Sequence, residues 1–172
     1  MRAAEHHGCE FLFDTEVTAI RTAASRVAGV DLAGGHRIDA PVVVNVAGPH
    51  SFVINRMAGV LDDMTITTKA LRHEVHHLPS PADLDFNSVG TTVSDSGNGV
   101  YIRPETGNHI LVGGEDPECD PKIWVDDPDM FDRELSRSVF ESQVFRLAKR
   151  LPDLGIPDRP KGVVDLYDVT DD

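Results

Sequence analysis

The densest group of chemically active side chains is His73-Glu74-Val75-His76-His77, which satisfies the pattern His-Glu-x-x-His. On a helix, this pattern places two histidines on one face, where they bind zinc while the glutamate acts as general base. On a strand the outer two histidines lie about 13 Å apart, too far to share one ion. The β-branched run Thr65-Ile66-Thr67-Thr68 favours a strand and Pro79 rules out a long helix, so we expect solvated strand histidines. The alternative is a zinc-dependent hydrolase that uses His73, Glu74 and His77.

The other groups of reactive residues are incomplete. His6, His7 and Cys9 have no second ligand pair at a zinc-like spacing. The acidic stretch 115–132 lacks the residue order of a calcium loop, so we expect a solvated loop and a helix start. No Gly-x-Ser-x-Gly elbow and no phosphate loop ending in Gly-Lys-Ser/Thr occurs. We therefore expect no metal site, and apart from the histidine cluster no motif supports a hydrolase or nucleotidase.

Charge and composition narrow the class of partner. The 172 residues contain 16 Lys and Arg against 29 Asp and Glu, a net charge of −13 that disfavours nucleic acids and anionic membranes. No apolar run approaches the roughly 20 residues of a membrane span. Two cysteines, Cys9 and Cys119, without a secretory signal favour a reducing compartment. We expect a cytoplasmic protein with a small-molecule substrate and neither nucleic-acid nor membrane partners.

The elements that must position any site differ between the two parts of the chain. In the first part, alternating apolar residues and turn signals predict a meander of three strands, 17–21, 27–32 and 36–38. The unbroken apolar run Val42–Val46 is typical of a strand buried on both faces of a parallel sheet. A turn at Ala47-Gly48-Pro49 and a helix follow it. The first part is therefore predicted to contain an α/β element.

The second part is predicted to be mainly antiparallel. Strands are expected over 65–78, 88–93, 100–103 and 109–113, a long helix over 128–151, and a last strand over 162–169. Tyr101 and Arg103 are two apart on one of these strands, so they point to the same side. Arg103 could there pair with a carboxylate through two hydrogen bonds, and Glu105 offers it a surface ion pair instead. The predicted fold class is mixed α/β (α+β).

Several segments together resemble the FAD-dependent amino-acid, sarcosine and glycine oxidase family. They are residues 8–30, Val43-Val44-Asn45-Val46-Ala47-Gly48-Pro49-His50-Ser51, Val100–Glu105, Ile110–Gly114 and Leu166–Asp171. The resemblance implies a partial FAD-binding Rossmann-like domain over 1–65, a substrate-binding domain over 66–160, and a return strand to the FAD-binding domain over 161–172. It also implies oxidation of the C–N bond of an amino acid or N-methylated amine by hydride transfer to the flavin.

The same resemblance assigns roles to particular residues. The backbone of Val17 would contact the adenine of FAD, and the turn at Ala47 and Gly48 would lie near the ribose and diphosphate. Gly48 suits that place because a Cβ would collide with a closely approaching cofactor. Tyr101 occupies the position at which related oxidases bind substrate, and its hydroxyl can donate to a carboxylate. The catalytic residues are left unassigned.

One hallmark of the resembled family does not occur. The fingerprint Gly-x-Gly-x-x-Gly, which cradles the dinucleotide diphosphate, is not found among the 172 residues. We therefore expect an internal fragment of a flavoenzyme, also without the C-terminal flavin loop, that binds FAD weakly or not at all and is inactive alone. The alternative is a non-catalytic fragment that folds without any affinity for FAD.

Overall fold

The computed structural model describes residues 1–172, and these fall into two units. The first comprises Met1–Thr67 together with Asp172, and the second comprises Thr68–Asp171. No helix in either unit has the length and apolar character needed to cross a membrane. The candidate substrate residues, Tyr101 and Arg103, lie in the second unit, and the candidate cofactor residues lie in the first.

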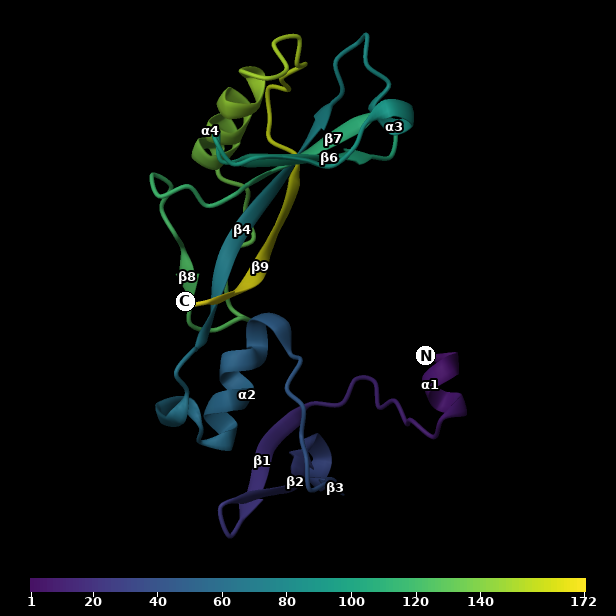
Figure 1. Ribbon diagram of the computed structural model, residues 1–172, viewed down its shortest axis with the longest axis vertical. Coiled ribbons are helices and arrows are strands. Elements are labelled where there is room, and N and C mark those ends of the chain that lie inside the picture. Colours follow the sequence, from purple (N-terminus) through teal and green to yellow (C-terminus); the bar gives the residue numbers. More distant parts are fainter. The chain divides into compact units, whose positions relative to one another are not determined.

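The first unit is built around a small antiparallel sheet with the order β1-β2-β3 (Figure 1). Its strands are β1 (Val17–Ala23), β2 (Arg26–Leu32) and β3 (Arg37–Asp39), which confirms the predicted meander. Helix α2 (Ser51–Ala58) packs on β1, and Ile20, Leu32 and Phe52 form the buried centre. The short elements are α1 (Arg2–His6), η1 (Ala33–Gly35), η2 (Gly48–His50) and η3 (Leu61–Asp63).

The prediction of a buried parallel strand at Val42–Val46 is wrong. The segment belongs to no sheet, and Val42, Val44 and Val46 are 70%, 75% and 86% exposed. A parallel strand needs hydrogen-bonded neighbours on its edges, and both sheets of this chain are purely antiparallel. The apolar composition of the segment indicated a strand, but composition does not show whether neighbouring strands are present to pair with it. Asn45 instead ties the extended segment to α2 through Nδ2, which donates to Ser51 O and Asn55 Oδ1, both at 2.9 Å.

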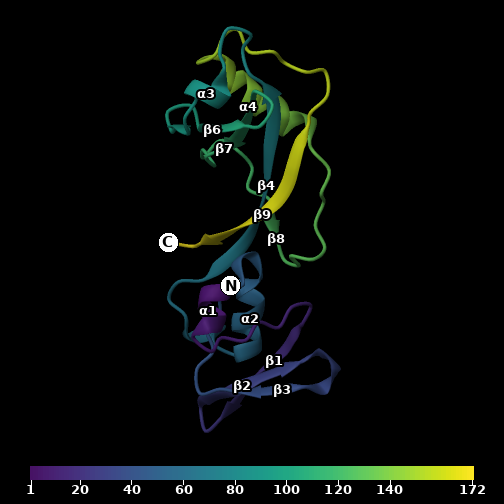
Figure 2. The same ribbon diagram turned by 90° about the vertical axis from the view of Figure 1, so that its right-hand side faces the viewer.

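The second unit is a six-stranded antiparallel sheet with one main helix. The strands are β4 (Thr68–Pro79), β5 (Val93–Asp95), β6 (Val100–Glu105), β7 (His109–Gly114), β8 (Trp124–Val125) and β9 (Gly162–Thr170). Their order is β5-β6-β7-β4-β8, and β9 pairs with the opposite edge of β4 along nearly its whole length, as Figure 2 shows. The strand expected near 161–172 is thus present, and it lies in the sheet of the second unit.

The core of the second unit lies between one face of this sheet and helix α4 (Arg137–Ala148), with the short helix α3 (Phe86–Val89) at its edge. The buried apolar side chains include Phe140, Val144 and Leu147 of the helix and Val100, Ile102, Leu78, Ile110 and Val112 of the strands. Because side chains alternate along a strand, the residues between these project from the opposite face. That face carries Tyr101, His73 and Tyr167.

Helix α4 is shorter than the predicted helix over 128–151, and Arg72 explains why. Arg72 Nε donates to Asp132 O at 2.7 Å, and its Nη2 donates to Glu134 O. Both carbonyls are thereby used by a side chain of β4 and not by helical N–H groups. The helix begins only after Ser136, whose N–H donates to Glu74 Oε2 at 2.9 Å.

A buried polar network therefore links β4 to α4. Arg72 Nη1 donates to Glu74 Oε1 at 2.6 Å, and the two side chains are 5% and 1% exposed. Gln143 donates to Glu74 O at 3.0 Å, and its side-chain oxygen accepts from His76 Nδ1 at 2.8 Å. Breaking a buried pair on one side leaves an uncompensated charge, which costs more than the pair itself contributes.

We predict that Glu74→Ala lowers the free energy of unfolding of the second unit by about 3–5 kcal/mol, because Arg72 loses its buried counter-charge. The matched control is Glu141→Ala, which removes an exposed i,i+4 partner of Arg137 and should cost about 0.5 kcal/mol or less. Urea titration followed by the fluorescence of Trp124, the only tryptophan, measures both. Equal losses in the two variants would contradict the structural role of the buried pair.

Candidate substrate site

The two tyrosines of the chain meet on the face of the large sheet that lies opposite α4. Tyr101 comes from β6 and Tyr167 from β9, and their hydroxyl oxygens are 3.1 Å apart. Trp124, the only tryptophan, pairs with Leu71 of β4, which pairs on its other edge with Tyr167, so all three aromatic residues share this face. Tyr167 and Trp124 are 44% and 43% exposed. We call this surface the aromatic face.

Gly113 of β7 makes the meeting of the tyrosines possible. It lies directly opposite Tyr101 in the strand register. A Cβ on Gly113 would stand 2.4 Å from Tyr101 Cε1 and 2.5 Å from its hydroxyl oxygen. The ring of Tyr101 therefore lies over Gly113 and reaches across β7 toward Tyr167.

His73 contacts the ring of Tyr167 directly. Its imidazole stacks on the tyrosine ring with centroids 4.2 Å apart and an interplanar angle of 26°. His73 Nε2 also lies 3.0 Å from Asp116 Oδ2, and the histidine side chain is only 9% exposed. Sequence reasoning placed His73 correctly on a strand, but the expectation that the strand histidines are solvated is wrong, since the side chains of His73 and His76 are 9% and 0% exposed. The sequence also gave no sign of Tyr167 or Asp116 as neighbours of His73.

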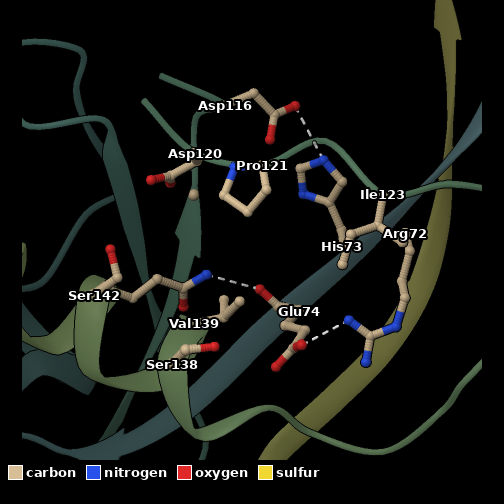
Figure 3. Close-up of a pocket in the computed structure, with 12 residues that line it drawn as sticks. Arg72, His73, Glu74, Asp116, Asp120, Pro121, Ile123, Ser138, Val139 and Ser142 are labelled. Atoms are coloured by element: carbon tan, nitrogen blue, oxygen red, sulfur yellow. Dashed lines mark hydrogen bonds and ion pairs between the residues drawn. The ribbon is translucent and has the colours of Figure 1, made fainter. Parts of the chain in front are cut away.

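Beside His73 lies a cavity of about 180 Å³ between β4, α4 and the loop after β7 (Figure 3). Its charged walls are paired: Arg72 with Glu74, Asp116 with His73, and Asp120 with Arg146. Hydrogen bonding from the Arg146 guanidinium lowers the pKa of Asp120, which keeps this carboxylate ionised. These acids and bases hold the walls together, and none is left as a free acid or base for chemistry.

The aromatic face offers uncharged hydroxyl groups as hydrogen-bond donors to a ligand. Burial, reinforced by the hydrogen bond with Tyr167, raises the pKa of Tyr101, so its phenol stays protonated at neutral pH. Of the two phenolic hydrogens in the pair, one bridges the two oxygens. The other is free to be donated to a ligand, and a carboxylate oxygen is the strongest acceptor that a substrate offers.

Arg103, the second predicted substrate residue, has a partner of its own. Its Nη1 lies 3.3 Å from Glu105 Oε2, and its side chain is 50% exposed. The surface ion pair that the sequence offered as an alternative is therefore formed. Arg103 stands two residues from Tyr101 on β6, so the two side chains project from the same face.

The zinc-hydrolase alternative is not supported by the geometry. His73 and His77 both lie on β4, so the helix that a His-Glu-x-x-His zinc site requires is not formed. Glu74 is buried against Arg72. His77 stacks on His109 at 4.3 Å, and burial followed by the nearby His109 lowers the pKa of His77. No group of three or more His, Cys, Asp or Glu side chains is placed to hold a metal ion.

The predicted cofactor residues come together in the first unit. Val17 and Ala47 line one cavity of about 240 Å³, whose other walls include Val30 and Ile54. Val17 begins β1, an edge strand with a free backbone edge, and apolar walls beside such an edge fit the adenine of FAD. Gly48 has φ +55°, and a Cβ there would meet nothing within 4 Å, so the turn is open to a ligand. Asn45 Oδ1 accepts from Ala47 N at 3.1 Å and shapes this turn, a role the sequence did not reveal.

Comparison with known proteins identifies the family. A family model described as FAD dependent oxidoreductase (DAO) matches residues 1–171. The chain therefore belongs to the DAO family of FAD-dependent oxidoreductases, in agreement with the resemblance noted in the sequence.

Two curated relatives are similar in sequence. Human mitochondrial sarcosine dehydrogenase is 29% identical over 167 residues, which cover 89% of this chain and 16% of that protein. The sarcosine oxidase subunit beta of Rhodobacter capsulatus is 32% identical over 115 residues, which cover 67% of this chain and 26% of that protein. The chain thus spans about a quarter or less of the length of these relatives.

Solved structures show the same fold. L-proline dehydrogenase from P. horikoshii superposes with a TM-score of 0.70 at 18% identity, covering 95% of this chain and 40% of that one. Glycine oxidase from Bacillus cereus superposes with a TM-score of 0.64 at 19% identity, covering 98% of this chain and 42% of that one. The mixed α/β fold with antiparallel sheets is therefore confirmed as that of FAD-dependent oxidoreductases.

We predict that Gly113→Ala displaces the ring of Tyr101 and breaks its hydrogen bond with Tyr167, while the fold survives because only a side chain must move. The absorbance titration of the two tyrosines measures the change, and ionisation should shift toward the pH expected of a free phenol, about 10. The matched control is Gly114→Ala, whose added Cβ would meet Gln143 Nε2 at an ordinary 3.8 Å. An unchanged titration in Gly113→Ala would show that the glycine does not set the position of Tyr101.

Proposed function

We propose that these residues form part of a FAD-dependent oxidoreductase that oxidises the C–N bond of an amino acid or N-methylated amine. The observation that carries the proposal is the hydroxyl pair of Tyr101 and Tyr167 on the aromatic face, which offers a neutral donor to a substrate carboxylate. Membership of the FAD-dependent oxidoreductase family and the sarcosine and amino-acid substrates named for its relatives support it.

The part played by these residues is to bind and orient the substrate. FAD, when bound, supplies the acceptor for the hydride that leaves the α-carbon of a neutral amine. The tyrosine pair holds the carboxylate at a fixed point. Arg103 lies on the same face and would have to exchange its ion pair with Glu105 for one with the carboxylate. Orientation of this kind supplies a large part of catalysis when the cofactor performs the chemistry. The imine product is then hydrolysed by water.

We further propose that residues 1–65 form the cofactor-binding part and residues 66–160 the substrate-binding part. Val17, Ala47 and Gly48 would hold the adenine, ribose and diphosphate of FAD. The cavity that Val17 and Ala47 share, and the open space beside Gly48, support this assignment. The 172 residues by themselves should bind FAD weakly, because the Val42–Val46 segment that leads into the turn belongs to no sheet and Val42, Val44 and Val46 are exposed.

The cofactor proposal predicts weak binding of FAD that AMP competes away and flavin mononucleotide does not, because the residues in question contact the adenine end. Fluorescence anisotropy of FAD titrated with the purified chain measures both. Binding that flavin mononucleotide displaces would contradict the assignment of Val17, Ala47 and Gly48. A colourless protein that added FAD leaves unchanged would instead support the alternative, a non-catalytic chain without affinity for FAD.

The substrate proposal predicts that Tyr101→Phe and Tyr167→Phe each weaken binding of sarcosine by about tenfold, since each removes a hydrogen bond at a charged acceptor. The double variant should lose less than the product of the two, because the hydroxyls act as one pair. Quenching of tyrosine and tryptophan fluorescence, or calorimetry, measures the affinities. Methylamine, which lacks the carboxylate, is the control ligand and should bind all variants alike. Equal effects on both ligands would refute carboxylate recognition.

A further inference from the structure

We propose that His73, anchored by Asp116, is a positioning residue for the Tyr101–Tyr167 pair. By fixing the ring of Tyr167, it sets the direction in which the pair offers its free hydroxyl hydrogen. The inference rests on the proposed function for the use of that hydrogen, whereas the positioning itself stands on the contacts of the aromatic face alone.

The first step in the argument is that Tyr167 has few supports of its own. It lies on β9, a strand at the edge of the sheet, and 44% of its surface is exposed. Two side-chain contacts restrain it, the hydroxyl contact with Tyr101 and the ring contact with His73. An exposed aromatic side chain has rotamer freedom to lose, so its orientation depends on what holds the ring.

The second step is that His73 is itself firmly held. Its side chain is 9% exposed, and Nε2 is joined to Asp116 Oδ2 at 3.0 Å. Asp116 lies in the loop that follows β7, the strand that also carries Gly113 beneath Tyr101. The end of β7 and the loop after it thus contact both tyrosines. Gly113 lies beneath Tyr101, and Asp116 acts on Tyr167 through His73.

The third step is that His73 acts on Tyr167 through the face of its ring. The ring planes of His73 and Tyr167 are 26° from parallel, so the imidazole presents its face to the tyrosine. The imidazole nitrogens lie in the ring plane and are directed sideways, one of them at Asp116. A histidine in this position presents no ring nitrogen to the tyrosine ring, so its effect on the pair is exerted through the position of Tyr167.

The test uses the fact that Tyr101 and Tyr167 are the only tyrosines of the chain. Absorbance of the ionised phenols during a pH titration therefore reports on this pair alone. We expect His73→Leu to shift tyrosine ionisation toward the pH of a free phenol, about 10, because the shielded hydroxyl contact is loosened. His73→Phe keeps an aromatic face under Tyr167 and should restore most of the native titration.

Two further variants separate positioning from a general loss of structure. Asp116→Asn keeps the imidazole in place but weakens its anchor, and it should give a shift between those of the native protein and His73→Leu. His77→Leu is the matched control, since His77 lies on the same strand and face but stacks on His109 and touches neither tyrosine. It should leave the titration unchanged. Equal shifts for His73→Leu and His77→Leu, or no shift for His73→Leu and Asp116→Asn, would overturn the proposal.

Binding of sarcosine distinguishes this inference from the proposed function. If both hold, His73→Leu weakens sarcosine binding about threefold to tenfold and His73→Phe recovers it. If the native protein binds no sarcosine but the titration shifts as expected, the positioning role stands and the proposed carboxylate recognition fails. If the native protein binds sarcosine and His73→Leu alters neither affinity nor titration, the positioning role fails while the proposed function remains.

Discussion

The alternation of side chains along β4 is the constraint on which the rest of the second unit depends. Arg72, Glu74 and His76 project into the core, where they tie the strand to the segment before α4 and to Gln143 within it. His73, between Arg72 and Glu74, projects to the opposite face and meets Tyr167. Any displacement of the strand is transmitted to both faces, because one backbone carries both sets of side chains. The position of the buried ion pair and the position of the aromatic face are therefore coupled through the backbone of β4.

Local chemistry in the sequence predicted much of this arrangement. β-branching before His73 and the proline after His77 correctly indicated a strand, and the spacing of Tyr101 and Arg103 correctly placed them on one side. The partners of these residues were beyond such reasoning. Tyr167 follows Tyr101 by 66 positions and reaches it only through the register of four strands. Register across a sheet is a property of tertiary structure, so no local sequence pattern predicts that Tyr101 and Tyr167 are in contact.

The strand expected over 88–93 is wrong, because residues 86–89 form helix α3 and β5 covers only Val93–Asp95. Two other errors in the fold share one origin. A run of valines indicates burial, yet burial at Val42–Val46 requires neighbouring strands, and the sheets of this chain offer none that are parallel. Helical periodicity indicated a helix from residue 128, yet Arg72 takes the carbonyls of Asp132 and Glu134 and delays its start to Arg137. In both cases a distant interaction overrides a local preference. Asn45, which orders the turn before α2, is likewise recognisable only once its partners are known.

The chemistry of the aromatic face agrees with that of a flavin-dependent enzyme. Where a cofactor accepts the hydride, the protein needs fixed donors more than it needs a strong base. Burial and pairing keep the phenol of Tyr101 protonated, so it serves as a donor and not as a proton acceptor. The imidazole of His73 turns its face to Tyr167 and its Nε2 to Asp116, so it presents no nitrogen to the tyrosine ring. In the proposed function, the tyrosine pair would hold the substrate carboxylate in a fixed position while FAD accepts the hydride.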